Sequence, residues 1–224
     1  MSNNTALLIF ARTASEESKH KSFQASEAFF KYQKKKLLKL AEESGLHYFW
    51  VDESQQTGKD FAHRYLNAIQ SIFDKNFDQV ISVGNDSPGL SLKHINQTID
   101  ILRSKDMCFG PSMDGGFYLW GVKKTFFKKE NFLDLSWRSK KLFSEFLDQL
   151  QLQSISTSCL QVLEDLDYPE DARRLLQTAK ISFSLKAILL QIINQKQIAS
   201  LVYQLHLKLK FIDVYYNKGS PKAT

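Results

Sequence analysis

The sequence predicts an α/β fold in three layers, with a mostly parallel sheet flanked by helices. Short apolar runs alternate along the chain with longer segments of helical pattern, as expected when helices connect parallel strands. The chain has 224 residues, of which 43% are hydrophobic, and this is enough for a substantial core. Its nine glycines and four prolines are too few for a collagen-like or low-complexity chain.

The expected strands are short apolar runs bounded by turn residues or by helical segments. The runs TALLIF and QVISV contain no charged residue, which is typical of strands buried on both faces. The run FYLWG follows a turn marked by two glycines. In chain order we expect strands over residues 5–10, 47–51, 79–83, 107–110, 117–121 and 154–158.

The expected helices show apolar residues at helical spacing or a composition rich in Lys, Ala, Glu and Leu. Residues 60–73 place their large apolar side chains three, four or seven positions apart, which puts them on one face. Gly45 stands where a glycine would end the first long helix. We expect helices over residues 22–43, 60–73, 91–103, 139–150 and 169–179.

The net charge of +6 is concentrated at the C-terminal end. Residues 180–224 contain seven lysines and one acid, Asp213, so the rest of the chain is neutral. We therefore divide the chain into a domain over 1–180 and a basic helical extension over 181–224. Leucines and isoleucines in the extension follow helical spacing and indicate a packing face against the domain or against a second copy in a homodimer. The residues that we expect on this buried face are Leu185, Ile188, Leu189, Ile192, Leu201 and Leu205. Peripheral contact with an anionic membrane is a further alternative.

Cysteine content and the chain start indicate a cytoplasmic location. Two cysteines cannot build a disulfide scaffold or, by themselves, a structural zinc site. The first apolar run is too short for a signal peptide and no basic stretch precedes it. No stretch approaches the roughly 18 apolar residues that a membrane-spanning helix needs.

The first candidate site segment is Gly84-Asn85-Asp86-Ser87-Pro88, directly after a predicted strand. An aspartate at the carboxyl end of a strand lies where α/β folds bind ligands, and its oxygens suit a divalent metal that holds a nucleotide diphosphate. The alternative is that Asp86 caps the next helix or that Ser87 and Pro88 form a turn.

The second segment is Asp114-Gly115-Gly116, between two predicted strands. Asp-Gly between apolar runs is a strong hairpin signal, and a turn is the favoured interpretation from spacing alone. Paired glycines also allow a ligand to approach the backbone closely.

The third segment runs from Glu164 to Asp171 and reads EDLDYPED. Asp167 could cap the following helix, whose first turn would hold Pro169. Asp165 has no such explanation. Acids at i and i+2 of an extended segment point to the same side, so Asp165 and Asp167 could share a metal.

These three segments, in this order, resemble an uncharacterised bacterial family of glycosyltransferase-like proteins with the GT-A fold, the nucleotide-diphospho-sugar transferase fold. The resemblance covers about residues 5–177, and its most specific part is GPSMDGGFYLWG. The element LSWRS and the segment GKDFAHRYLNAI, with Arg64, are similar to further family motifs.

The resemblance implies a metal-dependent glycosyl or nucleotidyl transferase that uses a nucleotide-sugar or a nucleoside triphosphate with Mg²⁺ or Mn²⁺. Asp86, Asp114 and Asp165 match catalytic positions, and Asp86 and Asp167 match metal ligands. The acceptor is unknown, and we expect no nucleic-acid partner. The positions that match cofactor-binding residues are Arg12, Lys19, Lys21, Arg64, Gly115 and Gly116.

The first loop departs from the family pattern, which is a glycine-containing segment with a K-T-R-L motif. Residues 11–22 contain no glycine or proline. Arg12, Lys19 and Lys21 could still meet a phosphate, but Glu16 and Glu17 lie between them. The alternative function is therefore a degenerate member of the fold that binds a ligand or partner without turnover.

Overall fold

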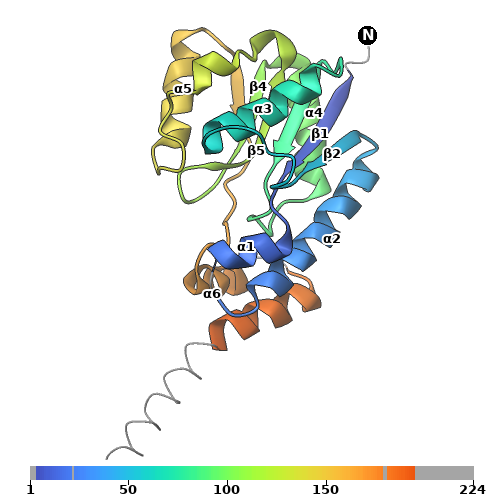
Figure 1. The fold of residues 1–224 in the computed structure, drawn as a ribbon, viewed down its shortest axis with the longest axis vertical. Coiled ribbons are helices and arrows are strands. Elements are labelled where there is room, and N and C mark those ends of the chain that lie inside the picture. Colours follow the sequence, from blue (N-terminus) through green and yellow to red (C-terminus); the bar gives the residue numbers. More distant parts are fainter. Residues whose placement is uncertain (1–3, 22, 179–180, 195–224) are drawn as a thin grey trace, which may run out of the picture.

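A mixed sheet of six strands forms the centre of the molecule, in the order β2-β1-β3-β5-β4-β6 (Figure 1). The computed structural model describes residues 4–21, 23–178 and 181–194. Strand β5 runs antiparallel to β3 and β4, and all other pairings are parallel, so the predicted mostly parallel sheet is confirmed. The strands are β1 (Thr5–Phe10), β2 (His47–Val51), β3 (Gln79–Val83), β4 (Met107–Pro111), β5 (Phe117–Lys123) and β6 (Thr157–Cys159).

Helices lie on both faces of the sheet, as predicted for a three-layer fold. One α-helix was not predicted, α1 (Ala14–His20) in the first loop. Thr13 caps it by accepting from the backbone N–H of Glu16 at 3.4 Å. The others are α2 (Ser26–Ser44), α3 (Phe61–Phe73), α4 (Leu92–Ser104), α5 (Leu142–Leu152), α6 (Pro169–Thr178), a helix over 183–194, and the 3₁₀ turns η1 (Lys124–Phe126) and η2 (Lys129–Phe132).

Two hydrophobic clusters fix the sheet between its helices. Side chains alternate along β1, so Ala6, Leu8 and Phe10 join the cluster formed with α3 and α5. Leu7 and Ile9 join the opposite cluster, formed with α2 and α4. This alternation follows from the two-residue period of a strand, and burial on both faces explains why the first predicted strand lacks polar side chains except Thr5 at its start.

A third hydrophobic cluster lies beyond the sheet and contains the first part of the C-terminal extension. Leu185, Leu189 and Ile192, from the helix over 183–194, are buried against Phe29 and Leu175 of helices α2 and α6. These three residues were expected on a buried face, and this is confirmed. Leu201 and Leu205, expected on the same face, lie outside the described residues.

The third cluster places α1, α6 and the helix over 183–194 together at one end of the molecule, where β1 ends (Figure 1). Loops that follow the parallel strands therefore meet these helices. No helix in the described part of the chain is long and apolar enough to cross a membrane.

The third cluster can be tested with two adjacent leucines. Leu189 is fully buried, whereas Leu190 is 43% exposed. Leu189→Ala should lower the free energy of unfolding by about 2–4 kcal/mol, because it leaves a cavity, while Leu190→Ala should cost about 0.5 kcal/mol or less. Urea denaturation measures both. Equal losses for the two variants would contradict the packing described here.

Candidate active site

A cavity of about 540 Å³ opens at the carboxyl ends of the strands. Four carboxylates predicted from the three motifs line it, and they come from three separate loops. Arginine and lysine side chains and several aromatic rings complete the wall. The charged and polar lining includes Arg12, Glu17, Lys21, Gln56, Asn85, Asp86, Ser112, Asp114, Arg138, Ser139, Lys140, Asp165 and Asp167.

Lys21 joins two of these loops by pairing with two carboxylates. Its Nζ lies 2.6 Å from Oδ1 of Asp167 and also contacts Oδ1 of Asp86. Burial alone would disfavour the ammonium, but the charges of Asp86 and Asp167 outweigh this effect and raise the pKa of Lys21. Lys21 is therefore charged at neutral pH and neutralises this part of the cavity.

Asp165 is a half-buried carboxylate of the cavity wall. It accepts a hydrogen bond from Oγ of Ser87. Burial, followed by the negative charge of Asp86, raises the pKa of Asp165 to about 7. Asp165 thus changes charge near neutral pH, whereas Asp86 and Asp167 share the ammonium of Lys21.

Backbone contacts hold the late acidic segment against the loop after β3. The N–H of Leu166 donates to the carbonyl of Asp86 at 3.0 Å, and Leu166 itself is fully buried. Asp171 in the first turn of α6 accepts from the backbone N–H groups of Asp167 and Tyr168 at 2.8 and 2.7 Å. The sequence had offered Asp167 as a cap of α6, but the carboxylate of Asp167 pairs with Lys21.

The segment from Asp114 to Gly116 is both a hairpin turn and part of the cavity wall. Oδ1 of Asp114 accepts from Oγ of Ser112 and from the N–H of Gly116, the latter at 2.9 Å. Gly115 has φ +92°, and a Cβ there would lie 2.1 Å from the carbonyl oxygen of Lys140. Only glycine fits this close approach. Gly115 therefore allows the turn to contact the loop before α5, whose Lys140 lines the cavity.

The first loop brings two of its predicted cations to the cavity and leaves one outside. Arg12 and Lys21 line it, together with Glu17. Arg12 lies 3.7 Å from Glu17, and burial, followed by the charge of Asp86, raises the pKa of Glu17. Lys19 pairs instead with Glu16 at 2.7 Å and is 70% exposed.

Arg64, predicted on α3, is half-buried and is not among the residues that line the cavity. Neither Lys19 nor Arg64 lines the cavity, and their assignment as cofactor-binding residues stays a prediction.

Several cavity residues were missed by sequence reasoning. Trp137 packs against Phe61 in a tilted arrangement and against Tyr65 edge to face, at ring-centre distances of 5.8 and 5.6 Å. The guanidinium of Arg138 lies 5.9 Å from the centre of the Phe61 ring. Arg138 has φ +65°, an uncommon conformation for a residue with a side chain. The only sequence signal was the LSWRS element, from which no role could be assigned.

The donor chemistry of the cavity suits a hard divalent cation. Asp86 and Asp167 present carboxylate oxygens around one positive group, the ammonium of Lys21, and carboxylate oxygens are preferred ligands of Mg²⁺ and Mn²⁺. Among the described residues, no group of three or more His, Cys, Asp or Glu side chains is arranged as a complete metal site. A metal here would need further ligands, as Mg²⁺ takes from water and substrate phosphates.

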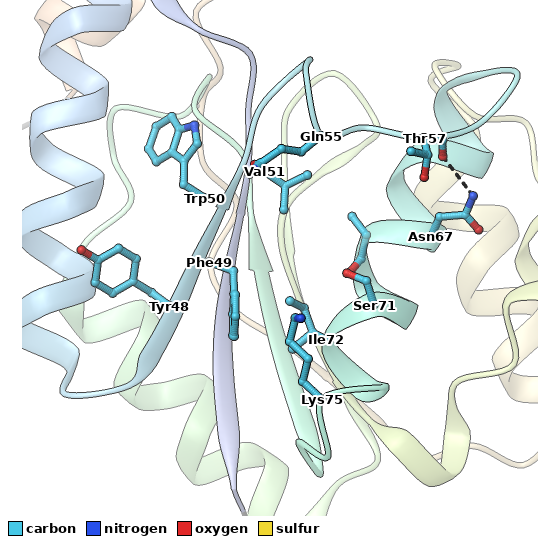
Figure 2. Close-up of a pocket in the computed structure, with 11 residues that line it drawn as sticks. Tyr48, Phe49, Trp50, Val51, Gln55, Thr57, Asn67, Ser71, Ile72 and Lys75 are labelled. Carbon is cyan, nitrogen blue, oxygen red and sulfur yellow. Dashed lines mark hydrogen bonds between the residues drawn. The ribbon is translucent and has the colours of Figure 1, made fainter.

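A second groove, of about 500 Å³, lies along the edge strand β2. Figure 2 shows that Tyr48 and Trp50 point to one side of β2, whereas Phe49 and Val51 point toward α3. Asn67 donates to the carbonyl of Thr57 at 2.9 Å in this groove. None of the described residues that line it carries a carboxylate, so these residues cannot provide the acid pair that the motifs predict.

Comparison with known proteins confirms the expected resemblance. A model of a family of uncharacterised proteins conserved in bacteria (DUF2064) matches residues 31–139. This range contains the motifs from Gly58 to Ser139 but neither the first loop nor the late acids. No significant match was found among curated proteins.

Comparison with solved structures identifies the fold. A candidate nucleotide-diphospho-sugar transferase from Desulfovibrio desulfuricans G20 is 21% identical with a TM-score of 0.73, over 88% of this chain and 98% of that chain. A glycosyltransferase involved in glycosylation of the PBCV-1 major capsid is 10% identical, with a TM-score of 0.49 over 70% and 81% of the two chains. The first of these matches shows that the chain has a nucleotide-diphospho-sugar transferase fold.

The raised pKa of Asp165 predicts a dependence of stability on pH. Between pH 3.8, the ordinary pKa, and about 7, Asp165 is protonated in the folded state and ionised in the unfolded state. Its contribution to stability is therefore complete below this window and is lost as pH rises through about 7. Asp165→Asn removes the carboxylate, so its stability relative to wild type should rise between pH 5 and pH 8, by on the order of 2 kcal/mol.

Urea denaturation in EDTA at the two pH values measures this difference. Asp148→Asn, at an exposed position of α5, is the matched control and should show no such change. A constant difference between Asp165→Asn and wild type would contradict the assigned burial of Asp165.

Proposed function

We propose that the chain is a metal-dependent transferase that acts on a nucleotide-sugar or a nucleoside triphosphate. The observation that carries this proposal is the convergence of Asp86, Asp165 and Asp167, with Arg12 and Lys21, in one cavity at the carboxyl ends of the strands. In folds of this type, ligands bind at that end of the sheet. The fold shared with the D. desulfuricans protein is consistent with the proposal.

The residues divide into roles by charge and position. Asp86 and Asp167 would hold Mg²⁺ or Mn²⁺, and the metal would neutralise the diphosphate leaving group. Arg12 and Lys21 would contact phosphate oxygens, because both are cationic and line the cavity. Asp165 is our candidate to accept a proton from the acceptor, since it lies beside Asp86 and Asp167 but is not contacted by Lys21.

The hairpin around Asp114 and the loop that carries Trp137 and Arg138 form the remaining wall. We assign this wall to the acceptor and to donor positioning. Its aromatic rings offer a stacking surface and Arg138 offers a positive charge beside it. Neither the aromatic rings nor Arg138 identifies the acceptor by itself.

The alternative proposal is a member of the fold that binds a ligand without turnover. One observation favours it: the first loop forms helix α1 and places Glu17 in the cavity, where a glycine-rich segment would leave room for phosphate. Both proposals expect a ligand to bind, so binding does not distinguish them. Turnover of a bound donor must therefore be measured.

The binding part of the proposal is tested by thermal unfolding with nucleoside diphosphates, nucleoside triphosphates and nucleotide-sugars, with and without Mn²⁺. At least one ligand should raise the melting temperature only when Mn²⁺ is present; a ligand at 100 times its Kd stabilises by about 2.7 kcal/mol. Asp86→Asn should abolish this rise and Asp148→Asn should keep it. If no ligand stabilises the protein with Mn²⁺, both proposals lose their support.

For a ligand that passes this test, release of the nucleoside diphosphate or of pyrophosphate distinguishes the two proposals. The transferase proposal expects release that depends on Mn²⁺ and is lost in Asp165→Asn. The non-catalytic alternative expects tight binding with no release above that of the Asp165→Asn variant.

A further inference from the structure

Lys21 occupies the position between the two carboxylates that we assign to the metal. Its ammonium contacts Oδ1 of Asp86 and lies 2.6 Å from Oδ1 of Asp167. A divalent ion would also require this arrangement, in which two carboxylate oxygens from different loops surround one small cation. The positive charge that neutralises this pair in the free protein therefore belongs to the chain itself.

The side chain of Lys21 is more buried than those of the two acids that it neutralises. Its side chain is 16% exposed, against 40% for Asp86 and 32% for Asp167. Its Nζ also lies 3.4 Å from the carbonyl oxygen of Leu166 and 5.4 Å from the centre of the Phe30 ring. The carboxylates thus remain open to the cavity while the ammonium contacts them from a more buried position.

An ammonium and a divalent ion on the same two oxygens repel each other strongly at such short separation. A metal can therefore bind Asp86 and Asp167 well only if Lys21 leaves at least one of them. We propose that Lys21 is an internal counter-ion that competes with the divalent metal for Asp86 and Asp167, so that the free protein binds the metal weakly. This proposal rests on the proposed function, because that function includes the metal.

The competition has a consequence for the order of binding. A diphosphate in the cavity offers Lys21 another anion, since Lys21 lines the same cavity as the acids. Occupation by the diphosphate would release the carboxylates, and the metal would then bind more tightly. By linkage, the metal would strengthen diphosphate binding by the same factor. The metal and the nucleotide would therefore enter as a cooperative pair.

The competition is tested with Mn²⁺ alone, by following free Mn²⁺ with electron paramagnetic resonance during titration of the full chain. Lys21→Met should bind Mn²⁺ more tightly than wild type, by roughly tenfold or more, which is within the usual range of coupling between sites. Lys21→Arg keeps the positive charge and should bind as weakly as wild type. The double variant Lys21→Met with Asp86→Asn should lose the gain, which would locate it at this site.

Lys19→Met is the matched control. Lys19 lies in the last turn of α1, shortly before Lys21, but it pairs with Glu16 at 2.7 Å and does not line the cavity. Its removal should leave Mn²⁺ affinity unchanged. Circular dichroism checks the fold of each variant, and Lys21→Gln replaces Lys21→Met if the latter is not folded.

Equal Mn²⁺ affinity in wild type and in the folded uncharged variant would overturn the proposal, as would an equal gain in Lys19→Met. These results are separate from a failure of the proposed function, since the titration contains no nucleotide. Metal-dependent nucleotide stabilisation with unchanged affinity in Lys21→Met would keep the function and reject the competition. A gain in Mn²⁺ affinity in Lys21→Met without any nucleotide stabilisation would support the competition and reject the proposed function.

Discussion

The pairing of Lys21 with Asp86 and Asp167 is the interaction on which the arrangement of the cavity depends. Asp86 and Asp167, together with Asp165, come from two loops far apart in the sequence, and like charges so close together repel each other. One buried ammonium from a third loop offsets this repulsion. Lys21 does not contact Asp165, and burial, followed by the negative charge of Asp86, raises the pKa of Asp165.

The packing of the molecule explains how three loops reach the same place. The two clusters on either side of the sheet fix β1 and β3, so the loops that follow them begin at defined positions. The third cluster joins α2 and α6 to the helix over 183–194. Since Asp167 lies shortly before α6 and Lys21 lies shortly before α2, part of the C-terminal extension supports the elements that carry the ion pair. The division at residue 180 therefore marks a change in charge, while the helix over 183–194 packs against helices of the preceding domain.

Much of the fold could be predicted, because burial leaves a plain pattern in β1, β3 and α3. The hairpin at Asp114 was also accessible, from its Asp-Gly signal and the apolar runs around it. Helix α1 was missed although Thr13, Glu16 and Glu17 form a recognisable helix start, because the segment was read as a phosphate-binding loop. The pairing of Lys21 with Asp86 spans 65 positions, and no spacing rule predicts it. The pairing of Asp167 with Lys21, in place of a cap on α6, likewise depends on how the late segment docks on Asp86.

We propose that Asp86 and Asp167 form a cation site shared with a nucleotide. Anomalous diffraction from crystals grown with Mn²⁺ and a stabilising nucleoside diphosphate locates the metal. We expect a Mn²⁺ peak in contact with Asp86 and Asp167, with the ammonium of Lys21 moved from at least one of them to a phosphate oxygen. A Mn²⁺ peak outside this cavity, or one beside Asp86 and Asp167 with Lys21 still bound to both, would contradict it.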